Sequence, residues 1–323
     1  MALFDDTPAT LTPLPEGVRA KFCDTLAIDH ERQVLYLADN WSGGVDVFDI
    51  SSPRAKYEAT IKLGGRVYGL SVASNVRKLY AGMSGSTLAV VDISAKSLAA
   101  QTVASQIITG GRNHVDLLDY EATRERVYAA NRMDGLLVTV DAVTDEIVGR
   151  TDGLGSGLEQ PRFNEADGMI YLTDNRDNVL YQIESESNRL VNRFPIGDPC
   201  FPNGLAIDAK ANRALLACSN KQRPHTVIWD LERQVVESVI EECGCGDGAL
   251  YEPSLDRYLF AANGSRMGPV VGIFGGDPVR LLRSVATAKG ASWVGYDRKN
   301  GVVYTTAIDG GRPALLSFPM PSV

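Results

Sequence analysis

Acidic or amide side chains occupy five of seven positions that recur in this sequence at nearly constant intervals, each opening a short segment that leads into an apolar run. The seven residues at this position are Asp24, Tyr68, Asp116, Glu159, Asn203, Asp247 and Ser292. Four carboxylates brought together either raise one another's pKa or need a cation. Oxygen ligands without histidine favour a hard divalent ion, Ca²⁺ or Mg²⁺, with Mn²⁺ or Zn²⁺ as substitutes. A water-filled acidic funnel without a metal is the alternative.

The intervals between these residues predict the elements that position them. Neighbouring members lie 43 to 48 residues apart, and most repeats continue with further short apolar or alternating runs. Residues 24–29 and 34–39, for example, are followed by a third run at 45–49 and a fourth at 57–61. Four short strands repeated seven times predict an all-β, seven-bladed β-propeller that forms one domain over residues 1–323. Residues at one register then surround a common axis.

The two ends of the chain predict how the ring closes. Only one apolar run, 314–318, follows the second strand of the seventh repeat, so that repeat is one strand short. We expect residues 9–17 to supply the missing outer strand, pairing with the strand that contains Leu315 and Leu316. Such a closure leaves no open sheet edge at this point.

Two resemblances follow from these segments. Arg-Val-Tyr-Ala-Ala-Asn at 126–131 and Met-Ile-Tyr-Leu-Thr-Asp-Asn at 169–175 resemble the YVTN-repeat propellers, which implies seven blades. Glu-Gln-Pro-Arg-Phe at 159–163, Pro-Asn-Gly at 202–204 and Asp-Gly at 247–248 are similar to segments of the gluconolactonase/senescence-marker-protein family. That resemblance implies Glu159, Asn203 and Asp247 as metal ligands and a metal-assisted hydrolysis of sugar lactones. The family has six blades, whereas seven are expected here.

The main functional hypothesis is therefore a metal-dependent hydrolase of a small lactone or ester. The ion would stabilise the developing oxyanion, and Asp24 or Asp116 would take a proton from the attacking water. The same parts would serve a metal-dependent lyase or isomerase. A non-catalytic YVTN-type propeller that binds a ligand or a protein is the other alternative.

Five residues are candidates for the mouth of this site. His114, two residues before Asp116, is either an acid or base or an ordinary surface histidine. Tyr68 and Trp293 are candidate pocket walls that contact the substrate. Arg112 and Arg162 either neutralise a substrate carboxylate or pair with the ring acids.

Composition limits the partners. Lys and Arg number 32 against 40 Asp and Glu, a net charge of −8, and no basic run is present. Nucleic acid and anionic membranes are therefore poor partners, and a small-molecule substrate is expected. No apolar stretch approaches the roughly 18 residues of a membrane span, and the N-terminus lacks signal-peptide features, so a cytoplasmic location is expected. The five irregularly spaced cysteines favour packed or free thiols. The oligomeric state is not predicted.

Overall fold

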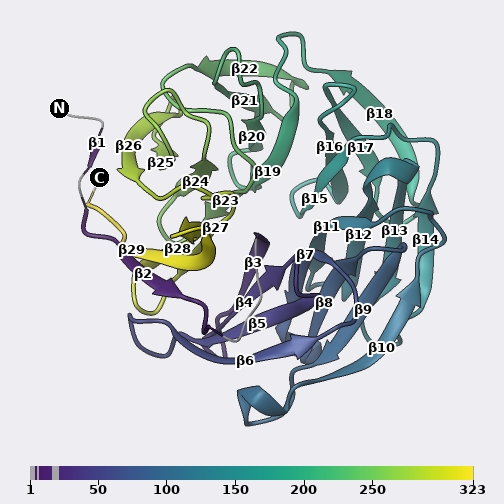
Figure 1. The fold of residues 1–323 in the computed structure, drawn as a ribbon. Helices are drawn as coiled ribbons and strands as arrows, with labels where there is room; N and C mark the ends of the chain where they lie inside the picture. Colours follow the sequence, from purple (N-terminus) through teal and green to yellow (C-terminus); the bar gives the residue numbers. More distant parts are fainter. Residues whose placement is uncertain (1–3, 6, 17–21, 323) are drawn as a thin grey trace.

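Seven β-sheets surround a common axis in the computed structural model, which describes residues 4–5, 7–16 and 22–322 (Figure 1). Each sheet contains four antiparallel strands in sequence order from the axis outward, apart from the two places where the N-terminus joins. This arrangement confirms the predicted all-β, seven-bladed propeller with four-stranded blades. No helix in the described part of the chain is long and apolar enough to cross a membrane.

The blades follow one another along the chain. Blade 1 consists of β3 (Cys23–Asp29), β4 (Val34–Asp39), β5 (Gly44–Asp49) and β6 (Lys56–Lys62); blade 2 of β7 (Val67–Ala73), β8 (Lys78–Met83), β9 (Thr87–Asp92) and β10 (Thr102–Ile108); blade 3 of β11 (Val115–Glu121), β12 (Arg126–Asn131), β13 (Leu136–Asp141) and β14 (Ile147–Thr151). Blade 4 consists of β15 (Leu158–Asn164), β16 (Met169–Asp174), β17 (Val179–Glu184) and β18 (Arg189–Pro195); blade 5 of β19 (Pro202–Asp208), β20 (Arg213–Cys218), β21 (Thr226–Asp230) and β22 (Val235–Ile240). Blade 6 consists of β23 (Ala249–Glu252), β24 (Arg257–Ala262), β25 (Val270–Gly275) and β26 (Arg280–Ala286); blade 7 of β27 (Val294–Asp297), β28 (Val302–Asp309), β29 (Arg312–Pro319) and β2 (Thr10–Pro13). Three short 3₁₀ helices, η1 (Ser74–Val76), η2 (Leu98–Ala100) and η3 (Arg132–Asp134), lie in connections.

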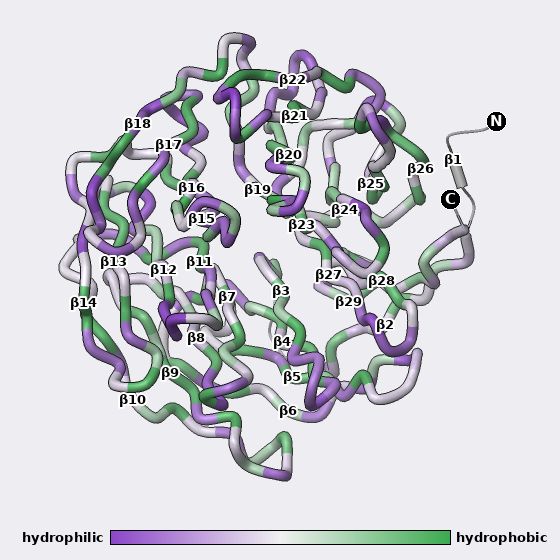
Figure 2. Tube along the Cα trace, turned by 180° about the vertical axis from the view of Figure 1, so that it is seen from behind, coloured by the Kyte–Doolittle hydropathy of each residue, from purple (hydrophilic) through white to green (hydrophobic). Residues whose placement is uncertain are grey.

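The apolar core lies between the blades. The second strands are buried almost throughout, as in β4, because a neighbouring blade covers each of their faces. Their central tyrosines, including Tyr36, Tyr128 and Tyr304, are fully buried. The buried side chains of the described residues form seven clusters, each shared by two adjacent blades. Figure 2 shows hydrophobic positions recurring in the strands all around the ring. Packing between blades, rather than within one sheet, therefore stabilises the ring.

The ring closes as predicted. β2 pairs antiparallel with β29, with Leu11 opposite Leu316 and Thr12 opposite Leu315. Of the predicted segment 9–17, residue 17 lies outside the described residues. The structure adds a contact that the sequence did not predict, because β1 (Phe4–Asp5) pairs in parallel with β26 (Figure 1).

Five of the seven residues of the predicted ring lie in β-bulges. In blade 1, Cys23 pairs with Asp39 and Leu26 with Leu37, so Asp24 and Thr25 together oppose the single residue Ala38. The same shift occurs in blades 2 to 5. A bulge inserts one residue and turns the local side chains. The prediction that each ring residue begins its inner strand is thus corrected: five are the second residue of the strand, and Asp247 and Ser292 precede β23 and β27.

Candidate functional site

The ring residues converge on a pocket of about 470 Å³. Its lining includes six of the seven predicted ring residues, namely Asp24, Tyr68, Asp116, Glu159, Asn203 and Asp247. In blade 7 the lining residue is Trp293, whereas Ser292 is buried and bonds the backbone of blade 1. The fold therefore brings the four predicted acids together in one pocket.

Close contacts between adjacent blades hold the ring residues in place. Thr25 Oγ1 donates to the carbonyl of Tyr68 at 2.6 Å, and Thr173 Oγ1 donates to that of Asn203 at 2.6 Å. Gly204 lies so near the next blade that an added Cβ would be 2.1 Å from the Asp247 carbonyl oxygen. These contacts fix ring residues where blades 1 and 2, blades 4 and 5, and blades 5 and 6 meet.

Arg132 supplies a cation inside the pocket. It follows β12 in η3, and its Nη1 lies 3.1 Å from Asp116 Oδ2 while its Nη2 lies 2.6 Å from Glu159 Oε1. Burial lowers the pKa of Arg132, but Glu159 and Asp116 outweigh this effect and raise it. Arg132 therefore stays protonated and bridges two of the four carboxylates.

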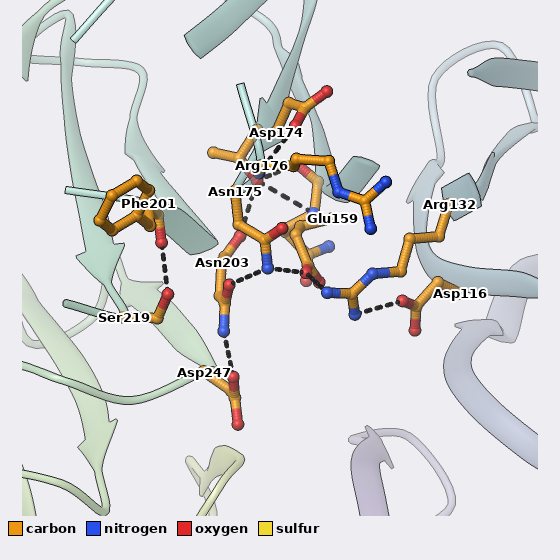
Figure 3. Close-up of polar contacts among 12 residues, drawn as sticks. Asp116, Arg132, Glu159, Asp174, Asn175, Arg176, Phe201, Asn203, Ser219 and Asp247 are labelled. Atoms are coloured by element: carbon orange, nitrogen blue, oxygen red, sulfur yellow. Dashed lines mark hydrogen bonds and ion pairs between the residues drawn. The ribbon is translucent and has the colours of Figure 1, made fainter. Parts of the chain in front are cut away.

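Two amides extend this network across the ring (Figure 3). Asn175 Nδ2 donates to Glu159 Oε1 at 2.5 Å and to Asn203 Oδ1 at 2.8 Å. Asn203 Nδ2 donates to Asp247 Oδ1. A third amide, that of Asn40, donates from Nδ2 to Asp24 Oδ2 at 3.4 Å. Asn40, Arg132 and Asn175 share a second register, the first residue after the second strand of a blade. Sequence reasoning missed this register, although polar residues follow the second apolar run in six of the seven repeats.

The pocket carries more negative than positive charge. Four carboxylates and two guanidiniums, those of Arg132 and Arg176, line it. Arg176 reaches Ser156 Oγ at 2.8 Å. Among the described residues, Asp24 and Asp247 have amide partners but no ion pair. Burial, followed by repulsion from Asp116 and Asp247, raises the pKa of Asp24 well above its usual value.

The pKa values of Glu159 and Asp247, two other carboxyl groups of the pocket, are raised for the same reason. Burial is the largest effect that raises the pKa of Glu159, with repulsion from Asp116 next. Burial also raises the pKa of Asp247, although the hydrogen bond from Asn203 and the charge of Arg132 oppose it. A further cation in the pocket would relieve this repulsion.

The predicted metal ligands lie together, but their present partners do not suit a metal ion. Glu159 Oε1 accepts from Arg132 and Asn175, and Asn203 Oδ1 accepts from Asn175, so N–H groups face these oxygens. Over the described ranges, the one group of three His, Cys, Asp or Glu side chains close enough to share an ion is Cys200, Cys218 and His225. Two of those three form a disulfide. A cation at Glu159, Asn203 and Asp247 stays a prediction, and as arranged these residues suit an N–H cation better than a hard metal ion.

Three other predicted residues line the pocket. His114 stacks on Tyr68 with ring centroids 4.3 Å apart, and its Nε2 lies 3.6 Å from Asp116 Oδ2. Trp293 forms part of the opposite wall. The pocket thus combines acidic groups with aromatic faces. Whether His114, Asp24 or Asp116 acts as an acid or base stays a prediction.

The two predicted arginines are not brought to the pocket. Arg162 bonds Asp119 Oδ1 at 2.9 Å and the Leu205 carbonyl at 3.0 Å, and it lines a different cavity. It lies three residues farther along β15 than Glu159, which is roughly 10 Å in a strand. Arg112 is exposed and does not line the pocket. Neither arginine pairs with a ring acid among the described residues, whereas a contact with a substrate carboxylate stays a prediction.

The cysteines also differ from the expectation. Cys200 and Cys218 form a disulfide, which joins the residue two positions before β19 to the last residue of β20. Cys23, Cys243 and Cys245 are buried thiols. Disulfides persist mainly in oxidising compartments, and the cytoplasmic location stays a prediction.

Large apolar side chains are exposed in the loops next to the ring residues. They are between 37% and 49% exposed and comprise Phe22, Trp41, Met133, Phe201 and Met267. Each precedes an inner strand or follows a second strand, at the end of the blade where the ring residues lie. They come from blades 1, 3, 5 and 6, and one of them, Met133, also lines the pocket.

Comparisons with known proteins identify the fold. No protein-family model matches the sequence, and no curated protein matches it either. Neither the YVTN nor the gluconolactonase resemblance is therefore confirmed. The chain is similar to the structure titled "Structure of U3-55K", with a TM-score of 0.77 and 10% identity over 96% of this chain and 98% of that one. It is also similar to a chain of "Crystal Structure of Mitotic Checkpoint Complex", with a TM-score of 0.77 and 12% identity over 98% of this chain and 93% of that one.

These structures correct the expected partner. One of the two titles names a complex, and neither names a small-molecule substrate. The expectation that the partner is a small-molecule substrate is therefore wrong on this comparison. In all, 1653 chains of solved structures are similar, so the likeness identifies a common fold and leaves function to the site.

Proposed function

We propose that this chain is a non-catalytic propeller that binds a protein partner through the face carrying the acidic pocket. A basic side chain of the partner enters the pocket, and neighbouring apolar side chains of the partner contact the exposed rim. The observation that supports this proposal most directly is the presence of two half-buried carboxylates, Asp24 and Asp247, with amide partners but no ion pair among the described residues.

A guanidinium or ammonium group suits this pocket for electrostatic reasons. Carboxylates removed from water are costly unless a cation and hydrogen bonds compensate them. Arg132 already binds Asp116 and Glu159 in this way, which leaves Asp24 and Asp247 to a cation from outside. Trp293 and the face of Tyr68 that does not stack on His114 add an attraction for a cation.

The apolar rim supports a macromolecular partner. Protein interfaces combine exposed aromatic and methionine side chains with a small number of deeply buried anchors. Trp41, Phe201 and Met133 provide such side chains next to the pocket, and Met133 also lines it. A partner segment that inserts one basic residue would cover this rim.

The test uses labelled peptides that differ only at one central position, occupied by Arg, Lys, Gln or Glu with apolar neighbours. Fluorescence polarisation should detect binding of the Arg and Lys peptides and a large loss for Gln and Glu. Asp24→Asn and Asp247→Asn should each weaken Arg-peptide binding roughly tenfold or more, because a charged pair is lost inside a desolvated pocket. Glu186→Gln is the matched control, since it removes one carboxylate whose side chain is 86% exposed.

Two results would contradict the proposal. Equal binding of Arg and Gln peptides would remove the electrostatic basis. Turnover of a lactone or ester panel, assayed with Ca²⁺, Mg²⁺, Mn²⁺ or Zn²⁺, would favour the metal-dependent hydrolase. A divalent ion at Glu159, Asn203 and Asp247 is tested in the same samples by its effect on thermal stability, because a native-state ligand stabilises by mass action.

A further inference from the structure

Phe201 has an unusual backbone conformation on the face that carries the pocket. Its φ is +51°, in the left-handed region that residues with a Cβ rarely occupy. Twelve non-glycine residues in the described part of the chain have a positive φ, and Phe201 is the one aromatic residue among them. Its side chain is 38% exposed and belongs to none of the apolar core clusters. Packing of the ring therefore does not explain the conformation.

Several contacts hold Phe201 in this conformation. Asn178 Oδ1 accepts from the backbone N–H groups of Cys200 at 3.0 Å and of Phe201 at 2.8 Å. Ser219 donates to the Phe201 carbonyl through its backbone N–H at 3.1 Å and its Oγ at 2.7 Å (Figure 3). The disulfide with Cys218 fixes the preceding residue. Cys245 and Gly290, which likewise lie two residues before the ring residue in blades 6 and 7, also have a positive φ, so the backbone conformation recurs in the fold. In blade 5 these contacts fix an exposed aromatic ring next to the pocket.

We propose that Phe201 is a preorganised apolar anchor for the partner, contacting a side chain close in sequence to the basic residue in the pocket. The inference rests on the proposed function and adds a specificity element to it. Phe201 lies two residues before Asn203, which lines the pocket, so their Cα atoms are at most about 7 Å apart. An extended partner segment covers that separation in one to three residues. Because the disulfide and Asn178 fix the loop in advance, little ordering cost is added on binding.

The test is a double-mutant cycle with peptides that contain Arg. Each peptide carries Leu one, two or three residues away from the Arg, and its counterpart carries Ala at the same position. Phe201→Ala should weaken the best Leu peptide about tenfold and leave its Ala counterpart nearly unchanged. Phe201→Gly should give the same loss; it removes the ring but suits the left-handed conformation, so it guards against misfolding of the Ala variant. Val148→Ala, at a residue 47% exposed on the outer strand β14, is the matched apolar control and should have no effect.

Removal of the disulfide by substitution gives a second test of the anchor. The double variant with Cys200→Ser and Cys218→Ser should weaken binding of the Leu peptide more than binding of the Ala peptide, as Phe201→Ala does. Equal weakening of both peptides by Phe201→Ala and Phe201→Gly, without coupling, would overturn the anchor. If the wild type fails to distinguish Arg from Gln peptides, the proposed function fails and the anchor fails with it. If it distinguishes them but shows no coupling, only the anchor fails.

Discussion

Arg132 and Asn175 determine which carboxylates of the pocket can receive a cation. Arg132 binds Asp116 and Glu159, and Asn175 directs its N–H group between Glu159 and Asn203. These contacts leave Asp24 and Asp247 on the other side of the ring with amide partners alone among the described side chains. Residues that follow the second strands thus divide the acids of the pocket into two groups. Asp116 and Glu159 pair with a cation, whereas Asp24 and Asp247 have amide partners alone among the described side chains.

Asp46 provides a separate residue-scale test of buried charge. It lies in β5 and is fully buried, and Thr60 donates to its Oδ1, while its Oδ2 has no hydrogen-bond partner in the part of the chain that the structure describes. Burial raises the pKa of Asp46 to about 7, although the Thr60 hydrogen bond opposes the shift. The folded state therefore binds the proton more tightly than the unfolded state, whose aspartates have a pKa of about 3.9. The stabilising contribution is full below about pH 4 and is lost as the pH rises through about 7.

Asp46→Asn should therefore stabilise the protein at pH 8, because Asn keeps the shape and the acceptor without the charge. The expected gain in the free energy of unfolding is on the order of 4 kcal/mol at pH 8, declining toward zero near pH 4. Urea unfolding of both proteins at pH 4.5, 6 and 8 measures this difference. A difference that does not change with pH would show that Asp46 is ionised to the same extent in both states.

At the scale of elements, the inner strands are positioned by a bulge and by the residue that follows the ring position. Gly204 occupies that following position in blade 5, and an added Cβ would lie 2.1 Å from the Asp247 carbonyl oxygen. Gly204→Ala should thus force blades 5 and 6 apart and destabilise the fold by about 1–3 kcal/mol. Gly197→Ala is the matched control, since nothing lies within 4 Å of its added Cβ and its φ is not left-handed.

Thermal unfolding and Arg-peptide binding measured on both glycine variants separate the two effects. Gly197→Ala should stay within about 0.5 kcal/mol of the wild type, as surface changes generally do. Gly204→Ala should lose stability and affinity together, because Asp247 moves with the displaced backbone. An unchanged Gly204→Ala protein would mean that the blades adjust more easily than their contacts suggest.

The elements also show how far the sequence could predict this site. The apolar runs with a central tyrosine, such as 34–39 and 302–307, were visible and predicted the blades. One register then predicted the lining acids. Arg132, Asn175 and Asn40 were missed because they lie after the second strand, and only the pairing of two strands brings that register beside the first. The bulges and the Cys200–Cys218 disulfide likewise depend on strand pairing, which sequence spacing alone does not reveal.

At the scale of the whole molecule, two N-terminal strands join the ring at different blades. β2 completes blade 7 by pairing with β29, and Leu14, which follows β2, is buried in the cluster between blades 7 and 1. β1 adds a parallel strand of two residues to the outer edge of blade 6. Closure of a propeller by its N-terminal strand couples the first and last blades, so the ring has no weak junction there.

Two truncations separate the contributions of these strands, each beginning with an initiator Met. Removal of residues 1–8 deletes β1 and should change the melting temperature little, because only two residues pair with β26. Removal of residues 1–15 also deletes β2 and Leu14, so it exposes the edge of β29 and opens a cavity at the junction of blades 7 and 1. Loss of one buried leucine alone costs about 2–5 kcal/mol, and each kcal/mol lowers the melting temperature of a chain of this size by roughly 1.5 °C. Calorimetry should therefore place the shorter protein at least several degrees below the 1–8 truncation. Equal melting temperatures for the two truncations would show that the ring is stable without its N-terminal strand and that packing between the other blades suffices.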